Sequence, residues 1–250
     1  MKMNKLQKLE IQNKANSFRK NFGYGETDPI RLVSFLLKQN ILTVFKPLSN
    51  NLAGMAIKAS TNDLFIMINQ NHILSKQHFT IAHELYHLFV QENFTSQRCV
   101  TGLFDKQTDI EEEKADCFAA NLLLPQLGVY ELIPDYEKKV KNKISKETIF
   151  KIQDYYSVSI NAVIYRLVDL ELVDKTYFEI YNQLSKKQLA RLLGYDIRLY
   201  EKGNIDRVIG NYGTIANTLF EKTLISESFY FELLNTIAID PFTKDDKEDE

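Results

Sequence analysis

Residues 79–91, FTIAHELYHLFVQ, form the stretch that most restricts how this chain can fold. An α-helix turns by about 100° per residue, so His83 and His87 point the same way and Glu84 lies beside them. The polar side chains of the stretch share one arc of roughly 100°, and the other residues up to position 90 are apolar. Such a helix is buried. Its polar stripe must therefore face a partner that offsets the cost of desolvation.

A metal ion is the partner that fits this stripe best. The spacing His-Glu-x-x-His places two imidazoles one helical turn apart, an arrangement typical of zinc ligands. A single buried histidine is more often a hydrogen-bonded core residue, but chance rarely produces the whole pattern inside an apolar helix. We therefore predict a Zn²⁺ site with His83 and His87 as ligands.

A second helix is predicted for residues 111–124, EEEKADCFAANLLL, and ends at Pro125. A catalytic zinc site takes three protein ligands and leaves one position open for water. Glu113 points away from the apolar stripe of this helix, whereas Glu112 lies on its edge, one turn before Asp116. Glu112 is the candidate third ligand, and Asp116 would lie just outside the ligand set. Glutamates at a helix start are also common as a solvated first turn, and this alternative stays open.

The two motifs together, FTIAHELYHLF and EEKADCFAANLLLP, resemble those of the ImmA/IrrE family of bacterial and phage metallopeptidases. The resemblance covers roughly residues 10–173. It implies a zincin-like peptidase fold and a set of site residues. These are the zinc ligands His83, His87 and Glu112, the catalytic base Glu84, and Asp116, which would orient a ligand imidazole.

The resemblance also implies a substrate, a helix-turn-helix transcriptional repressor that is cleaved to derepress phage, mobile-element or stress genes. The chain departs from the family pattern at Tyr86, where a small residue is common, and at Lys114, where Glu or Gln is common. An oxyanion donor is expected as well, and Tyr130 and Tyr136 are candidates. The alternative function is a non-cleaving regulatory or toxin-antitoxin module that binds a repressor or another partner protein around a structural metal.

The remaining sequence predicts an α+β fold that is mainly helical, with a small antiparallel sheet. Helical spacing predicts a helix over residues 5–22, and Asp28 is placed to cap a second helix that starts at Pro29. Short runs rich in branched and aromatic residues predict three strands, at residues 41–45, 52–58 and 63–69. The third strand could be an edge along which an extended peptide pairs, or a plain core strand.

Four units are expected along the chain. A zincin-like metallopeptidase domain would occupy residues 1–140, a helix-turn-helix-like segment 141–173, a helical C-terminal domain 174–243 and an acidic tail 244–250. The second helix of the helix-turn-helix offers Asn161 and Arg166 beside acidic residues. DNA binding through it is therefore not expected, because DNA recognition needs basic or amide side chains.

Composition agrees with an ordinary globular protein of 250 residues, with 44% hydrophobic and 26% charged residues. A net charge of −2 provides no general attraction to nucleic acid or anionic membranes. The sequence contains no apolar run near the ~20 residues of a membrane span, and its start, MKMNKLQKLE, lacks the apolar core of a secretory signal. Two cysteines do not indicate a disulfide framework. We expect a cytoplasmic protein without a membrane partner.

Overall fold

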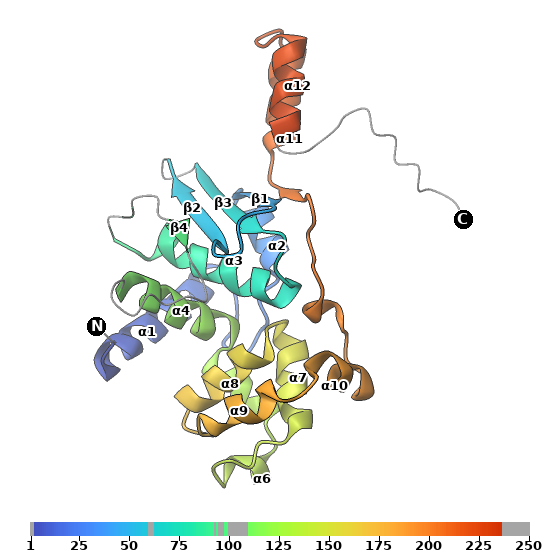
Figure 1. Cartoon of the computed structure of the whole chain (residues 1–250). Coiled ribbons are helices and arrows are strands. Elements are labelled where there is room, and N and C mark those ends of the chain that lie inside the picture. The colour runs from blue at the N-terminus through green and yellow to red at the C-terminus, as the bar shows by residue number, and fades with distance from the viewer. Residues whose placement is uncertain (1–2, 60–62, 93, 95–97, 100–109, 237–250) are drawn as a thin grey trace.

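The apolar stretch around the two histidines forms the central helix of the fold, α3 (Leu74–Phe89). The computed structural model describes residues 3–59, 63–92, 94, 98–99 and 110–236. Every residue of α3 from Thr80 to Leu88 is buried, because the helix lies between a β-sheet and a layer of helices (Figure 1). The α+β, mainly helical fold predicted from the sequence is confirmed.

Two helices, α1 (Lys5–Asn21) and α4 (Ile110–Leu123), cover the side of α3 away from the sheet. The small side chains of Ala115, Ala119 and Ala120 are buried on α4, and they let it pack closely against both α1 and α3. Aromatic rings join the far ends of these elements. Phe18 of α1 lies 5.6 Å from Phe89 of α3 and 5.6 Å from Phe118 of α4, measured between ring centroids.

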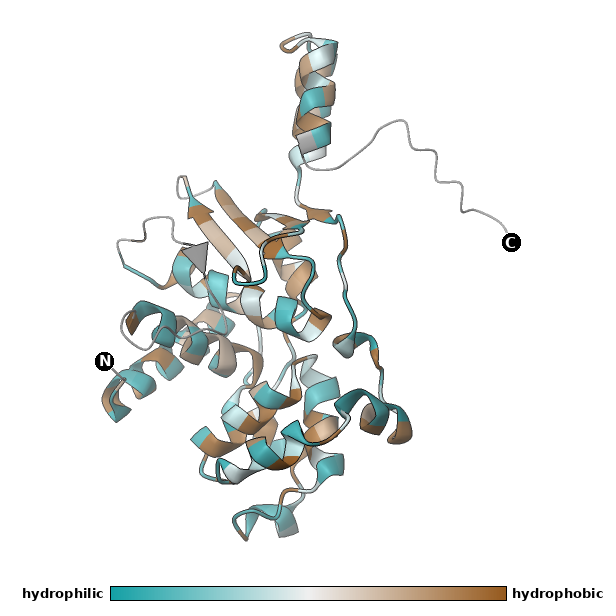
Figure 2. Ribbon diagram, viewed as in Figure 1, coloured by the Kyte–Doolittle hydropathy of each residue, from teal (hydrophilic) through white to brown (hydrophobic). Residues whose placement is uncertain are grey.

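Within the described ranges, the sheet has five strands in the order β4-β2-β3-β1-β5. Their bounds are β1 Leu42–Lys46, β2 Gly54–Lys58, β3 Leu64–Asn69, β4 Arg98–Cys99 and β5 Val208–Ile209. The face packed on α3 carries Ala56, Ile66 and Ile68, which are fully buried. Figure 2 shows the apolar character of β2 and β3.

One prediction about the sheet is wrong. The sheet is mixed rather than antiparallel, because β1 pairs with β3 in parallel. Of the two interpretations of the third strand, the structure confirms the core strand, because β3 lies between β2 and β1. The reason lies in the connection over residues 47–53, which crosses the end of β3 before β2 begins. The buried amide of Asn69 fixes this crossing by donating to the carbonyl oxygens of Ser49 and Leu52 at 3.0 and 2.8 Å.

The helix expected to start at Pro29 begins later in the sequence. It is α2 (Leu32–Lys38), with Arg31 rather than Asp28 at its N-cap. The Asp28 carboxylate accepts from the backbone N–H of Gly25, and the backbone carbonyl of Asp28 accepts from the Arg19 side chain. Asp28 therefore closes the turn after α1 and is not available to cap α2.

The helix-turn-helix-like segment forms as predicted from α7 (Lys146–Tyr156) and α8 (Ile160–Asp169). Ser145 and Ser159 cap the two helices through their side chains, and Ser157 ends α7 in the left-handed conformation with φ of 52°. Two shorter helices, α5 (Gln126–Leu132) and α6 (Asp135–Lys138), connect this segment to α4.

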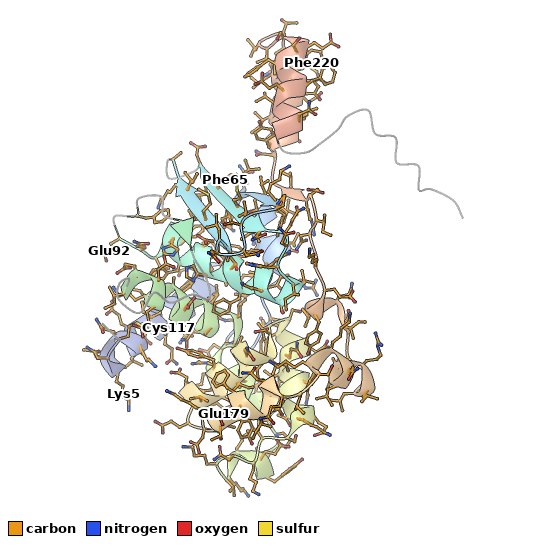
Figure 3. The ribbon with its side chains drawn as sticks, in the orientation of Figure 1. Lys5, Phe65, Glu92, Cys117, Glu179 and Phe220 are labelled. Carbon is orange, nitrogen blue, oxygen red and sulfur yellow. The ribbon has the colours of Figure 1, made fainter. Side chains whose placement is uncertain are left out.

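Up to residue 236, where the described residues end, the C-terminal third contains four helices and a 3₁₀ turn, with bounds α9 Thr176–Asn182, α10 Lys186–Leu192, η1 Arg198–Tyr200, α11 Tyr212–Glu221 and α12 Glu227–Thr236. Between η1 and α11 the chain returns to the sheet, where β5 pairs with β1. Beyond β5, α11 and α12 pack on each other and project from the body (Figures 1 and 3). The four-unit division stays a prediction, and the acidic tail lies outside the described residues.

Over the part of the chain that the structure describes, no helix combines the length and the apolar character needed to cross a bilayer.

Candidate metal centre

The predicted ligands come together at the contact between α3 and α4. His83 and His87 lie one turn apart on α3, and Glu112 belongs to the first turn of α4. The Nε2 atom of His83 is 3.2 Å from Oε2 of Glu112, and that of His87 is 3.5 Å from Oε1. The ligand atoms of the three residues all lie within 4.8 Å of one another, so the group can hold a metal ion.

The outer ring nitrogen of each histidine faces an oxygen acceptor. Nδ1 of His83 is 2.8 Å from Oδ1 of Asp116, and Nδ1 of His87 is 2.5 Å from Oε1 of Gln91. We therefore assign the proton of each neutral imidazole to Nδ1, which leaves a lone pair on each Nε2. Asp116 thus occupies the place that the sequence predicts.

The Nε2 atoms, which are the inner ring nitrogens of the two histidines, show whether these residues suit a metal ion. The two Nε2 atoms lie 3.1 Å apart, with the Glu112 carboxylate beside them. Three Lewis bases that converge in a buried site repel one another unless a cation lies among them. Two imidazoles and a carboxylate, each histidine held by an outer acceptor, are typical of a zinc site.

Burial lowers the pKa of His87, and the nearby His83 acts in the same direction, although the hydrogen bond to Gln91 and the Glu112 carboxylate oppose these effects. The neutral imidazole is therefore favoured at His87. A neutral imidazole is the form that binds a metal ion.

Glu84 lies beside the histidines on α3 and is buried against the sheet. A Cβ atom at Gly54, the first residue of β2, would meet Oε1 of Glu84 at 3.2 Å and Cγ2 of Thr80 at 2.7 Å. The glycine thus gives the carboxylate room between the helix and the strand. Gly54 was missed in the sequence, because a glycine in a strand pattern does not show which side chain approaches it.

Phe94 was also missed. Its ring stacks on His87 with a centroid distance of 5.5 Å and an angle of 27° between the planes. The residue follows the helix in a polar stretch where no periodicity marks it. It covers one face of the imidazole.

The structure places the two tyrosines suggested as oxyanion donors on α5 and α6. Tyr136 is 72% exposed on α6, which Figure 1 places well away from α3. Tyr130 belongs to α5 and is partly buried against the hydrophobic core. Tyr136 is therefore excluded as an oxyanion donor, and the structure gives no support for Tyr130.

The fold and the site together define a class. A buried helix that carries His-Glu-x-x-His, with a glutamate from a second helix facing both histidines, is the arrangement of metallopeptidases. In agreement, residues 37–168 match the peptidase family M78, described as the IrrE N-terminal-like domain. The match spans more than half of the chain, which therefore belongs to this family. A comparison with curated proteins finds no match.

Proposed function

We propose that this protein is a zinc-dependent endopeptidase that cleaves a helix-turn-helix transcriptional repressor. The observation that carries the peptidase proposal is the convergence of His83, His87 and Glu112 beside the buried Glu84. Membership of a metallopeptidase family supports the same reaction class. The repressor as substrate follows from the resemblance of the two motifs to the ImmA/IrrE proteins, and it implies a role in transcription regulation and a cytoplasmic location.

In the proposed reaction, each residue of the site has one task. His83, His87 and Glu112 would hold the ion, while Asp116 and Gln91 keep the histidine protons on Nδ1. The bound ion would supply a Lewis acid that activates water and polarises the scissile carbonyl.

Glu84 would take a proton from the attacking water as the new C–O bond forms. It would then pass this proton to the amine nitrogen as the peptide C–N bond breaks. The Glu84 carboxylate is buried against Gly54, which limits its movement.

The test uses the full chain, Zn²⁺ and a helix-turn-helix repressor encoded beside it. We expect Zn²⁺-dependent cleavage, which Glu84→Gln abolishes while the protein still binds one equivalent of metal. The matched control is Glu113→Gln, since Glu113 accepts from the backbone of Met3 and does not belong to the ligand cluster. A repressor that stays intact with the wild-type protein, or is cut equally by Glu84→Gln, would contradict the proposal.

A second candidate function is a non-cleaving regulatory or toxin-antitoxin module that binds a repressor or partner protein around a structural metal. The projecting pair α11 and α12 favours it, because Ile215, Leu224 and Phe229 are exposed there. These residues lie outside the family match. Equal capture of an intact repressor by the wild type and by Glu84→Gln would support this function.

A further inference from the structure

The first turn of α4 holds three consecutive glutamates, and the outer two are fixed by contacts with other residues. The hydroxyl group of Tyr86 on α3 donates to Oε2 of Glu111 at 2.7 Å, and Nζ of Lys114 donates to Oε1 at 2.6 Å. The Glu113 carboxylate accepts from the backbone N–H of Met3 at 2.9 Å. Glu112 lies between these two held neighbours and faces the histidines.

The Tyr86–Glu111 hydrogen bond joins the two helices next to the ligands themselves. Tyr86 precedes His87 in the sequence, and Glu111 precedes Glu112. The phenol ring is 2% exposed, and it packs against Phe118 of α4 with a centroid distance of 5.7 Å. Its hydroxyl group therefore has one fixed position relative to α4.

The first turn of a helix needs such support, because its N–H groups lack partners within the helix and helix ends fray. Glu112 is only two residues after Ile110, where α4 begins. A ligand carboxylate on a fraying turn would reach the histidines for only part of the time. Restraining Glu111, the residue before Glu112, keeps the turn formed and the Glu112 carboxylate within reach of the histidines for more of the time.

We propose that Tyr86 and Glu111 are positioning residues that hold Glu112 toward His83 and His87, with Lys114 holding the second oxygen of Glu111. This inference rests on the metal site of the proposed function. Both oxygens of Glu111 are engaged by Tyr86 and Lys114, and Glu111 does not belong to the ligand cluster. The hydrogen bond thus supports metal binding without taking part in it.

The experiment measures Co²⁺ binding to the full-length, metal-free chain through its visible absorption, with no peptidase assay. We expect Tyr86→Phe and Glu111→Ala each to raise the Kd for Co²⁺ by about three- to tenfold, below the 10- to 100-fold loss typical when a direct ligand partner is removed. The visible bands should also change in shape, because the Glu112 carboxylate is less well fixed. Without metal, the melting temperatures of both variants should be close to those of the two control variants, Tyr200→Phe and Glu147→Ala.

Two control variants lose similar groups away from the metal. Tyr200→Phe removes a hydroxyl group that donates to Gln153 at 2.5 Å, and Glu147→Ala removes a first-turn glutamate from α7. Unchanged Co²⁺ affinity and spectra in both Tyr86→Phe and Glu111→Ala, or equal losses in the controls, would overturn the positioning role. Co²⁺ binding that survives His83→Ala unchanged would instead overturn the metal site itself.

Discussion

The side-chain amide of Gln77, buried on α3, donates a hydrogen bond of 2.7 Å to the carbonyl oxygen of Gly203. The same amide group donates to the carbonyl of His72 at 3.0 Å, and its oxygen accepts from Asn204 at 3.0 Å. Gly203 and Asn204 lie beyond the family match. A segment of the C-terminal third therefore holds the N-terminal end of the helix that carries the histidines.

Replacing Gln77 by leucine should destabilise the metal-free protein. The substitution leaves buried carbonyl groups without their donor, which costs about 1–3 kcal/mol, and urea unfolding measures the loss. Gln12→Leu is the matched control, because Gln12 bonds Gln126 on the exposed surface, and its effect should stay within about 0.5 kcal/mol. Equal stability of the two variants would show that the Gly203 contact contributes little.

Removing the carboxylate of Asp116 should weaken metal binding. Asp116→Ala leaves Nδ1 of His83 without its acceptor. The loss of such a partner typically lowers metal affinity by about 10- to 100-fold, and we expect a loss of about this size for Asp116→Ala. Asp116→Asn should lose less, since its amide oxygen can still accept. Chelator competition measures the Kd, with the exposed Asp135→Ala as control. Wild-type affinity in Asp116→Ala would argue against this role.

The site could be predicted because its geometry is mostly local. Helical turn alone places His83, Glu84 and His87 on one stripe and puts Glu112 and Asp116 on one edge of the second helix. The apolar neighbours of both motifs indicate that the two helices are buried. Their mutual contact could not be derived from periodicity, and came from the resemblance to a known family.

The errors in the fold arose where distant residues decide the outcome. Asp28 has the right type and place for an N-cap, but its carboxylate bonds the backbone N–H of Gly25 instead. Arg19 of the previous helix holds the backbone carbonyl groups of both residues. The parallel pairing of β1 with β3 depends on a loop that crosses the end of β3 and bonds to Asn69. Neither contact leaves a periodic signal in the sequence. The Gln77–Gly203 hydrogen bond is equally invisible, because it joins residues 126 positions apart.

Metal-free stability should fall as the pH drops below about 6.5. Burial lowers the pKa of His78 from its ordinary value of 6.5, against a smaller opposing effect of its hydrogen bond to the Ser157 carbonyl. The unfolded chain then takes up a proton at a higher pH than the folded chain. The stability is complete above the unfolded pKa and is lost as the pH falls toward the folded one.

Unfolding free energies measured between about pH 7 and pH 5.5 check this effect. Burial also lowers the pKa of His72 and that of His87, so His78→Gln should reduce the pH dependence without removing it. A curve for His78→Gln that runs parallel to that of the wild type would contradict the contribution of His78.

Adding a methyl group at Gly54 should disturb Glu84 and the helix that carries it. The new Cβ would lie 2.7 Å from Thr80 Cγ2 and 2.9 Å from the Met67 carbonyl oxygen, so the strand or α3 must shift. Overpacking of this kind costs about 1–3 kcal/mol. We expect Gly54→Ala to lower both the unfolding free energy and peptidase activity. Normal activity in Gly54→Ala would show that the site tolerates the shift.

Arg166, the basic residue that the helix-turn-helix could offer to DNA, is used inside the protein. Its guanidinium group is 2% exposed, donates to the Leu124 carbonyl at 3.0 Å and pairs with Asp169 at 2.9 Å. Arg166→Met should therefore cost about 1–3 kcal/mol of stability, because the Leu124 carbonyl loses a buried donor. Asn161→Ala, an exposed change on the same helix, should cost less than about 0.5 kcal/mol.

The same contacts predict no mobility shift with duplex DNA at low salt, where binding through phosphate contacts is strongest. Helix α8 then serves to hold the end of α4 through Arg166, since Leu124 directly follows α4. A salt-sensitive shift that Arg166→Met removes, in a variant that stays folded, would refute this view. A loss of stability with no DNA binding in either protein would support it.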